Sequence, residues 1–283
     1  MSAYSGPLLT RAVAELILAA RATGAATVSV TLDLGRSTVD LALGADGWFC
    51  SGAHHPWPEG LKERTIYFWD DNTFVPLQRY SGSLIKLVPT EWGPPTFEID
   101  GIKMLPTAQV SPYADAQRKV ALVQTRGKQV LDTCGGLGYF AACCLAEGAT
   151  RVRSYEKNAD VLWLRGHNPW SPDAESESRL ELIHADVVQA IATLPDESFD
   201  AALHDPPRFG IAGELYSQTF YDQLARVLRG HARLFHYTGT PNAKTSGRDV
   251  PAEVARRLGK AGFNAERALD GVLAVKRGNS PPR

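Results

Sequence analysis

Hydrophobic and polar positions divide the chain into two parts of different texture. Between residues 26 and 105, β-branched and aromatic residues form short runs separated by turn residues, a pattern typical of antiparallel strands. The expected strands are Thr27–Leu32, Thr38–Leu43, Thr65–Trp69, Thr73–Leu77, Leu84–Val88 and Thr96–Ile102. A helix around Ala12–Ala20 precedes them. The pattern predicts a β-rich accessory domain over residues 1–110.

From residue 111 onward, apolar strands alternate with longer helical stretches. The expected strands are Gln129–Thr133, Arg151–Glu156, Leu180–Ala185, Phe199–His204, Ala232–Tyr237, Ala265–Leu269 and Gly271–Val275. The expected helices include Pro112–Gln124, Leu137–Glu147, Gly213–Leu228 and Pro251–Ala261. This alternation predicts an α/β domain over residues 111–283 with a doubly wound, mostly parallel sheet. Ligands of such sheets bind outside the carboxyl ends of the strands, so candidate chemistry is sought there.

Composition and charge narrow the classes of function. The 283 residues include 30 Lys and Arg against 31 Asp and Glu, so no overall positive field attracts nucleic acid or an anionic membrane. The apolar stretch Ala12–Ala20 is shorter than the roughly 20 residues that a membrane-spanning helix needs. The four cysteines have no Cys-x-x-Cys spacing. We therefore expect a reduced, cytoplasmic protein without a membrane partner.

The first strand of the second part ends in a glycine turn. Asp132-Thr133-Cys134-Gly135-Gly136-Leu137-Gly138-Tyr139 departs from the Gly-x-Gly-x-x-Gly spacing of dinucleotide sites. A carboxylate at Asp132 also disfavours a phosphate. It suits a cation instead, such as the ammonium or the sulfonium group of S-adenosylmethionine.

Three further strand ends carry carboxylates. Glu156, followed by Lys157, comes 24 residues after Asp132, about where this fold class places the carboxylate that binds ribose hydroxyls. At the next strand end, Asp186 either accepts from an adenine amino group, with Val187 on the ring, or caps a helix. Asp205 precedes two prolines that remove two backbone donors, which leaves acceptors for an amine.

Together these strand ends resemble class I S-adenosylmethionine-dependent methyltransferases over residues 111–277, which implies a Rossmann-like domain. The motifs Thr96–Met104, Asn168–Ser171 and His204–Phe209 with Gly213–Tyr216 also resemble predicted methyltransferases first noted in archaea. The resemblance implies S-adenosyl-L-methionine as cofactor. The implied cofactor-binding residues are Asp132, Cys134, Gly136, Gly138, Tyr139, Glu156, Lys157, Asp186, Val187 and Asp205. Cys134 stands where this family usually has its first glycine.

The expected reaction is methyl transfer to a small molecule that bears an amine. Asp205 is expected to orient the amine, while His204 or Tyr237 takes a proton. Aromatic faces can hold a sulfonium by cation–π contact. The aromatic candidates are Tyr113, Tyr139, Phe209 and Tyr216. The predicted catalytic residues are Asp205, His204 and Tyr216.

Three alternatives remain open at this point. The same cofactor also donates a 3-amino-3-carboxypropyl or aminopropyl group, or closes a ring on itself, and then releases methylthioadenosine. An RNA base methyltransferase has a similar Asp-Pro-Pro turn, but the sequence lacks a basic footprint. A protein that only binds a partner has no need of carboxylates at all four strand ends. His54-His55 is expected in a loop without a metal, and residues 238–249 as a loop near the site.

Overall fold

The computed structural model describes residues 4–208, 210, 212–239 and 249–278. The predictions made for Phe209 and for most of the loop at 238–249 fall outside these residues. The chain divides into two compact units, of which unit 1 comprises Met1–Pro112 and Trp163–Ser171 and unit 2 comprises Tyr113–Leu162 and Pro172–Arg283. Residues 163–171, which the sequence assigns to the second domain, thus belong to unit 1.

Unit 2 contains a seven-stranded sheet with the strand order β14-β13-β12-β15-β16-β18-β17. The strands are β12 (Gln129–Asp132), β13 (Arg151–Glu156), β14 (Leu180–His184), β15 (Phe199–His204), β16 (Leu228–Tyr237), β17 (Phe263–Ala268) and β18 (Gly271–Lys276). The first five pair in parallel, and only the β18 pairings are antiparallel. The doubly wound, mostly parallel sheet expected from the sequence is confirmed.

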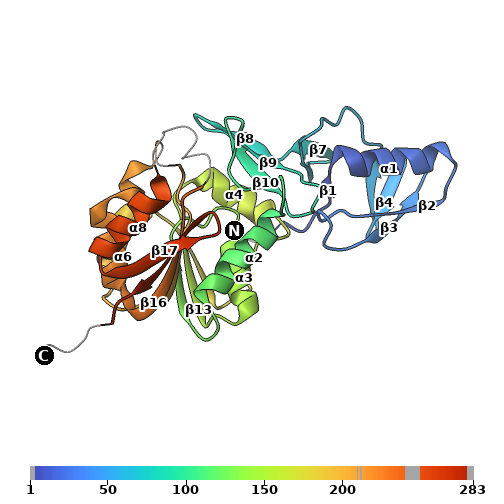
Figure 1. The fold of residues 1–283 in the computed structure, drawn as a ribbon. Coiled ribbons are helices and arrows are strands. Elements are labelled where there is room, and N and C mark those ends of the chain that lie inside the picture. The colour runs from blue at the N-terminus through green and yellow to red at the C-terminus, as the bar shows by residue number, and fades with distance from the viewer. Residues whose placement is uncertain (1–3, 209, 211, 240–248, 279–283) are drawn as a thin grey trace, which may run out of the picture. The chain divides into compact units, whose positions relative to one another are not determined.

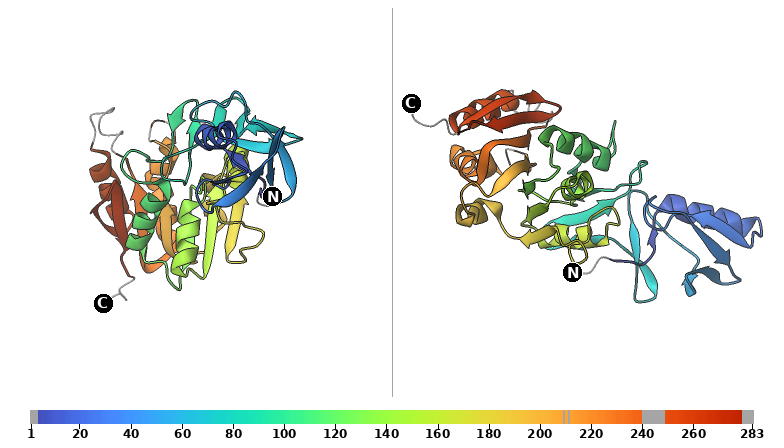
Figure 2. Two further views of the ribbon diagram at one scale, coloured as in Figure 1. Left: turned by 90° about the vertical axis from the view of Figure 1, so that its right-hand side faces the viewer. Right: turned by 90° about the horizontal axis from the view of Figure 1, so that it is seen from below.

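Helices cover both faces of this sheet. They are α2 (Pro112–Val123), α3 (Tyr139–Glu147), α4 (Ala159–His167), α5 (Val187–Ala190), α6 (Gln218–Val227) and α8 (Val250–Lys260), with 3-10 turns η1 (Ile191–Thr193) and η2 (Gly213–Tyr216). Figures 1 and 2 show α2 and α3 on one face and α6 and α8 on the other. On α6, Phe220 and Leu224 lie one helical turn apart and are buried in the core with Leu258 of α8.

The single helix expected over 213–228 is interrupted. Ser217 separates η2 from α6, and its hydroxyl accepts a hydrogen bond from the backbone N–H of Phe220 at 3.1 Å. Serine satisfies an orphan donor at a helix start, which explains why a new helix begins here.

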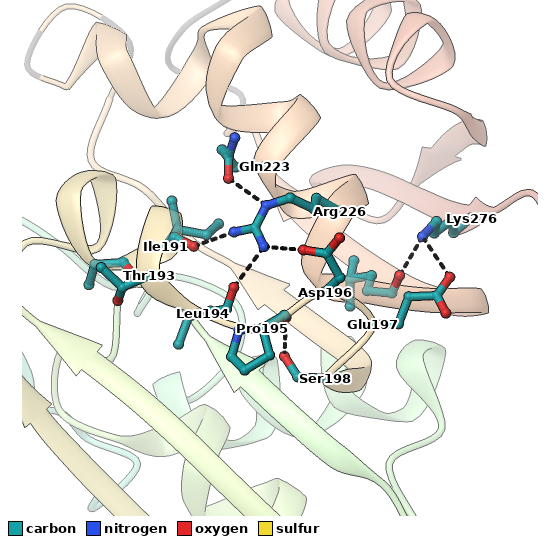
Figure 3. Close-up of polar contacts among 12 residues, drawn as sticks. Ile191, Thr193, Leu194, Pro195, Asp196, Glu197, Ser198, Gln223, Arg226 and Lys276 are labelled. Carbon is teal, nitrogen blue, oxygen red and sulfur yellow. Dashed lines mark hydrogen bonds and ion pairs between the residues drawn. The ribbon is translucent and has the colours of Figure 1, made fainter.

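Arg226, on the last turn of α6, fastens the segment between η1 and β15 (Figure 3). Its guanidinium group donates to the backbone carbonyls of Ile191 and Leu194 at 2.8 and 2.7 Å, and also to the side chain of Asp196. The Arg226 side chain is 27% exposed, so these bonds are only partly screened by water. They hold the approach to β15, the strand that leads to Asp205.

Unit 1 contains three antiparallel sheets and the helix α1 (Arg11–Ala22) (Figure 1). The sheets are formed by β1 (Leu8–Leu9), β6 (Tyr67–Asp70) and β7 (Thr73–Pro76); by β2 (Thr27–Val30), β3 (Val39–Leu43), β4 (Gly47–Cys50) and β5 (Ala53–Pro56); and by β8 (Gln78–Tyr80), β9 (Leu84–Val88), β10 (Thr96–Ile99) and β11 (Ile102–Lys103). Ile17, Leu41 and Trp48 are fully buried in its core.

The prediction of a loop at His54-His55 is wrong, because both residues lie on the edge strand β5. The side chain of His55 is 2% exposed and stacks on Trp48, with ring centroids 4.3 Å apart. Its Nδ1 atom has no hydrogen-bond partner among the described residues. Burial lowers the pKa of His55, and so does the charge of His54. Within the described ranges, no cluster of side chains is arranged to hold a metal ion, and no helix is long and apolar enough to cross a membrane.

Candidate functional site

The carboxyl ends of four neighbouring parallel strands carry the predicted acidic residues. Asp132 ends β12 and Glu156 ends β13, and Asp205 follows directly after β15. Asp132 stands opposite Ser154 on one neighbouring strand and opposite Leu203 on the other. Asp186 follows β14 at the outer end of this row. The topology therefore brings the strand-end carboxylates to one edge of the sheet, as predicted.

A glycine bend connects β12 to α3 at this edge. Gly136 and Gly138 have positive φ angles of 49° and 81°, a region in which any residue with a Cβ is strained. The N–H of Gly135 donates to the carbonyl of Tyr155 at 2.7 Å, and the N–H of Gly136 donates to Oε2 of Glu156 at 3.0 Å. The bend is thus fixed onto the end of β13.

Glu156 holds two backbone donors at once. Besides the Gly136 bond, its Oε1 accepts the N–H of Asn158 at 2.8 Å. The Glu156 side chain is only partly buried. These two bonds orient the carboxylate at the end of β13.

Asp132 is fully buried, and its Oδ2 accepts the hydroxyl of Ser154 at 2.7 Å. A buried carboxylate needs such partners because its desolvation is costly. Cys134, two residues after Asp132, is partly buried and begins the glycine bend. Burial, followed by the charge of Glu156, raises the pKa of the Cys134 thiol well above its ordinary value, so the thiol stays protonated.

At the outer strand end, Asp186 caps a helix. Oδ1 of Asp186 accepts the N–H of Val188 at 2.9 Å, which caps α5, and its Oδ2 lies 4.0 Å from Nζ of Lys157. Val187 is 4% exposed and belongs to the core cluster. Asp186 thus has the helix-capping role that the sequence left open. The Lys157 side chain is exposed.

Asp205, directly after β15, has an altered pKa. Burial raises the pKa of its carboxyl to about 7; Lys119 acts in the opposite direction, while Asp270, Asp115 and Asp132 raise it further. A carboxyl with a pKa near 7 exchanges its proton close to neutral pH, which is the property of a general acid or base.

Lys119, Asp115 and Asp270 all act on the pKa of this carboxyl, and none of the three was predicted from the sequence. Nζ of Lys119 lies 2.6 Å from Oδ2 of Asp115, one turn earlier on α2, and 3.1 Å from Oδ2 of Asp270. Asp270 lies in the turn between β17 and β18. We refer to Asp115, Asp205, Asp270 and Lys119 as the charged cluster. The i, i+4 spacing of Asp115 and Lys119 and the Leu269-Asp270-Gly271 turn were its only signals in the sequence.

The predicted proton acceptor His204 is fully buried. Its Nδ1 lies 2.7 Å from the hydroxyl of Thr133, and its Nε2 lies 3.0 Å from the carbonyl of Leu215. Burial lowers the pKa of His204 to about 4, so the ring is neutral at physiological pH. Because both nitrogens have protein partners, the geometry favours a structural role over the predicted catalytic one.

The predicted aromatic residues are also largely enclosed. Tyr139, at the start of α3, is 4% exposed and meets the ring of Tyr113 edge to face at 5.8 Å. Tyr216 is 1% exposed, and its hydroxyl donates to the carbonyl of Pro207 at 3.1 Å. This bond fixes the segment that follows Asp205. Tyr237, at the end of β16, lies beneath Lys119, whose Nζ is 4.5 Å from the ring centroid.

These features fit a sulfonium nucleoside better than a phosphate ligand. The site combines an oriented carboxylate at Glu156, a glycine bend that permits close approach, and the buried carboxylate of Asp132. A phosphate would meet negative charge here, whereas a sulfonium, an ammonium group or ribose hydroxyls would find acceptors.

The chain is similar in sequence to an archaeal protein and, over a shorter stretch, to a bacterial one. No protein-family model matches the chain. The uncharacterized protein MJ1233 of Methanocaldococcus jannaschii is 43% identical over 219 residues, which cover 76% of this chain and 74% of that protein. Polyamine aminopropyltransferase 2 of Streptomyces coelicolor is 29% identical over 123 residues, 41% of this chain, but the match spans only 22% of that protein's length.

Solved structures that share the fold include two spermidine synthases. A spermidine synthase in complex with the transition-state analogue AdoDATO superposes with a TM-score of 0.56 at 17% identity, covering 72% of this chain and 77% of that one. The spermidine synthase of Thermotoga maritima gives a TM-score of 0.54 at 17% identity, with 73% and 76% covered. At this level of identity the likeness is one of fold.

Proposed function

We propose that this chain, which belongs to the same family as the archaeal protein MJ1233, is a transferase that moves an aminopropyl-type group from a sulfonium nucleoside to an amine. The donor is S-adenosylmethionine or its decarboxylated form. The observation that carries the proposal is the charged cluster: three carboxylates and one ammonium group leave a negative excess where an acceptor would meet the nucleoside.

The strand-end residues provide places for each part of the donor. Glu156 would accept the ribose hydroxyls, since its carboxylate is already aligned by two backbone donors. Asp132 and the bend at Gly136 would hold the amino-acid or aminopropyl part, and Asp186 would lie toward the adenine. When bound, the donor supplies a sulfonium-activated carbon, at which an amine displaces the sulfur and methylthioadenosine leaves.

Asp205 would then orient the acceptor amine and take its proton. An ammonium ion is not a nucleophile, so the acceptor must lose a proton before or during the reaction. With its pKa raised to about 7 by burial, Asp205 is a stronger base than an ordinary carboxylate and is still partly ionised at neutral pH. Orientation of the two reactants supplies much of the remaining rate gain, up to about 7 to 11 kcal/mol in favourable systems.

Aminopropyl transfer is preferred over methyl transfer for two reasons. The local match to polyamine aminopropyltransferase 2 and the fold shared with the two spermidine synthases both support it. The negative cluster supports an acceptor that carries more than one amine, because each additional ammonium group would be attracted to it. The expectation of methylation, drawn from the sequence, becomes the competing outcome of the test.

The test is to identify the released nucleoside. The protein is incubated with S-adenosylmethionine or with decarboxylated S-adenosylmethionine, each with and without a panel of mono-, di- and triamines, and the products are separated by mass spectrometry. Methylthioadenosine that appears only when an amine is present is the expected result. Release of S-adenosylhomocysteine would replace the proposal by methyl transfer, and release of methylthioadenosine without an amine would point to ring closure.

Asp205→Asn provides the matched control for this assay. It keeps the size of the side chain but removes the base. We expect the rate of nucleoside release to fall at least about 100-fold, which is the lower range for general-base catalysis. Nucleoside binding should remain, because the strand ends at Glu156 and Gly136 are untouched. Full activity of this variant would remove Asp205 from the mechanism.

A further inference from the structure

Lys119 is a lysine that the protein buries almost completely. Its side chain on α2 is 1% exposed, and its ammonium group lies between Asp115 and Asp270 at 2.6 and 3.1 Å. The ring of Tyr237 covers it at 4.5 Å. Moving an ammonium group out of water is costly even when it is paired, and an apolar residue of similar volume is often no less stable there. Stability alone therefore gives a weak reason for a lysine at this position.

The position of Asp205 gives a stronger reason. His204 pairs with His236 in the register of β15 and β16, so Asp205 comes beside Tyr237, whose ring contacts Lys119. Asp115 on α2, Asp132 on β12 and Asp270 in the β17–β18 turn all favour the protonated form of Asp205. Lys119 is the cation that opposes them. Among the described residues, the charge of Asp205 also acts on the thiol of Cys134 and on the hydroxyls of Tyr216 and Tyr237. Burial raises the pKa of all three groups, so they are neutral near pH 7.

We propose that Lys119 is a positioning residue for the reaction: its fixed ammonium group keeps a negative charge on Asp205, so that Asp205 can take the proton of the acceptor amine. The inference rests on the transferase function proposed above. It adds a residue that contacts neither reactant. Lys119 acts through the field that it places on Asp205, and the pair with Asp115 and Asp270 holds it in position.

Lys119 itself cannot be the nucleophile or the base. Burial lowers its pKa, but the nearby carboxylates of Asp205, Asp115 and Asp270 outweigh burial and raise it above the ordinary lysine value. Its ammonium group thus keeps all its protons, and a protonated amine neither attacks carbon nor accepts a proton. What Lys119 offers is a permanent positive charge.

The first test measures the titration of Asp205 in the full-length protein without any ligand. Carboxyl resonances of ¹³C-labelled aspartate are followed against pH, and Asp205 is assigned with Asp205→Asn. Lys119→Met should move the Asp205 titration upward by about 1 to 3 pH units, the usual effect of a close opposite charge. Arg118→Met is the matched control, because this neighbour on α2 carries the same charge but is exposed. It should move the titration by far less.

Asp270→Asn tests the same field with the opposite sign. It removes a negative charge and keeps Lys119, so the Asp205 titration should move downward. This variant carries the test if Lys119→Met does not fold. A shift of Asp270→Asn in the same direction as Lys119→Met, or no shift in either, would overturn the inference.

The second test is the pH profile of the reaction. The acidic limb of kcat/KM should move upward in Lys119→Met, with at least a tenfold loss at one pH unit below the wild-type midpoint, and Lys119→Arg should restore it. A role limited to structure would lower the melting temperature and leave the limb in place. Should the wild-type protein release no nucleoside with any amine, the proposed function fails, whereas the ligand-free titration still decides the role of Lys119.

Discussion

The carboxylate of Glu156 gives the sharpest test of the nucleoside site. Glu156→Gln changes one oxygen to an amino group and preserves the size of the side chain. In the native protein both oxygens are occupied, because Oε1 accepts from Asn158 and Oε2 accepts from Gly136. Glutamine has one acceptor oxygen, so its amino group must face one of these two N–H donors.

The size of the effect follows from these contacts. Hydrogen bonds to a charged acceptor are worth about 1.5 to 3 kcal/mol and those to a neutral one about 0.5 to 1.5, so each ribose hydroxyl loses roughly 1 kcal/mol. Two hydroxyls lose about 2 kcal/mol, which is about a 30-fold loss of affinity. The backbone N–H that faces the amino group of the glutamine is left unpaired, which lowers the folding stability by about 1 to 3 kcal/mol.

Isothermal titration calorimetry with methylthioadenosine measures this loss, since that nucleoside retains the ribose and carries no sulfonium charge. Glu147→Gln is the control: Glu147 lies at the other end of α3 and accepts the hydroxyl of Thr125 at 3.0 Å. Its affinity should equal that of the wild-type protein. If the wild-type protein binds methylthioadenosine and the affinity of Glu156→Gln lies within a factor of two of the wild-type affinity, the ribose role of Glu156 is refuted.

Three further predictions concern folding and the thiols. Arg226→Met should destabilise unit 2 by about 2 to 4 kcal/mol, because two partly buried carbonyls lose a charged donor. Arg229→Met, which removes one partly exposed ion pair, should cost under about 1 kcal/mol, and hydrogen exchange of β15 and β16 measures both losses. Because burial lowers the pKa of His55, the unfolded state binds a proton on this residue at a higher pH than the folded state does, so the stability of unit 1 should fall as the pH drops below about 6.5. His55→Phe should make this fall of stability with pH less steep, as measured by unfolding followed with tryptophan fluorescence, and an equally steep fall would contradict the prediction. Burial raises the pKa of Cys143 to about 12, so maleimide should label Cys50 well before Cys143 in the native protein, and equal rates would refute this.

Tryptophan positions make the His55 measurement specific to one unit. All six tryptophans of the chain lie in unit 1, within residues 1–112 and 163–171. Tryptophan fluorescence therefore reports on unit 1, and unit 2 needs a backbone probe such as hydrogen exchange. The effects of His55→Phe on unit 1 and of Arg226→Met on unit 2 can therefore be measured separately.

The strand-end carboxylates were predictable because they obey a local rule. Asp132, Glu156 and Asp205 each come at the end of an apolar run, and parallel strands bring such ends to one edge. The capping of α5 by Asp186, one of the two roles that the sequence allowed, also follows from a short segment. For this reason the α/β domain and half of its candidate site could be derived without coordinates.

The rest depends on contacts that no short window contains. Lys119 reaches Asp270 from a helix that precedes the whole sheet, and only the folded chain brings α2 beside the last hairpin. His55 was expected in a loop. The structure makes it a strand through the β4–β5 hairpin, where Ser51 and Gly52 have positive φ angles, and through stacking on Trp48.

Net charge misleads for the same reason. The chain as a whole is almost neutral, which from the sequence excluded a global attraction for polyanions and left the acceptor open. Folding separates the charges. Most basic side chains of the described residues are not buried, so water and salt screen them, whereas Asp115 and Asp270 pair with the buried ammonium group of Lys119, which also acts on the pKa of Asp205. Because screening is weak in such a place, this local negative excess would act on the acceptor in the proposed function. A phosphate backbone would be repelled there and a polyamine attracted, so the charged cluster favours an amine acceptor over a nucleic acid more strongly than any property of the whole chain.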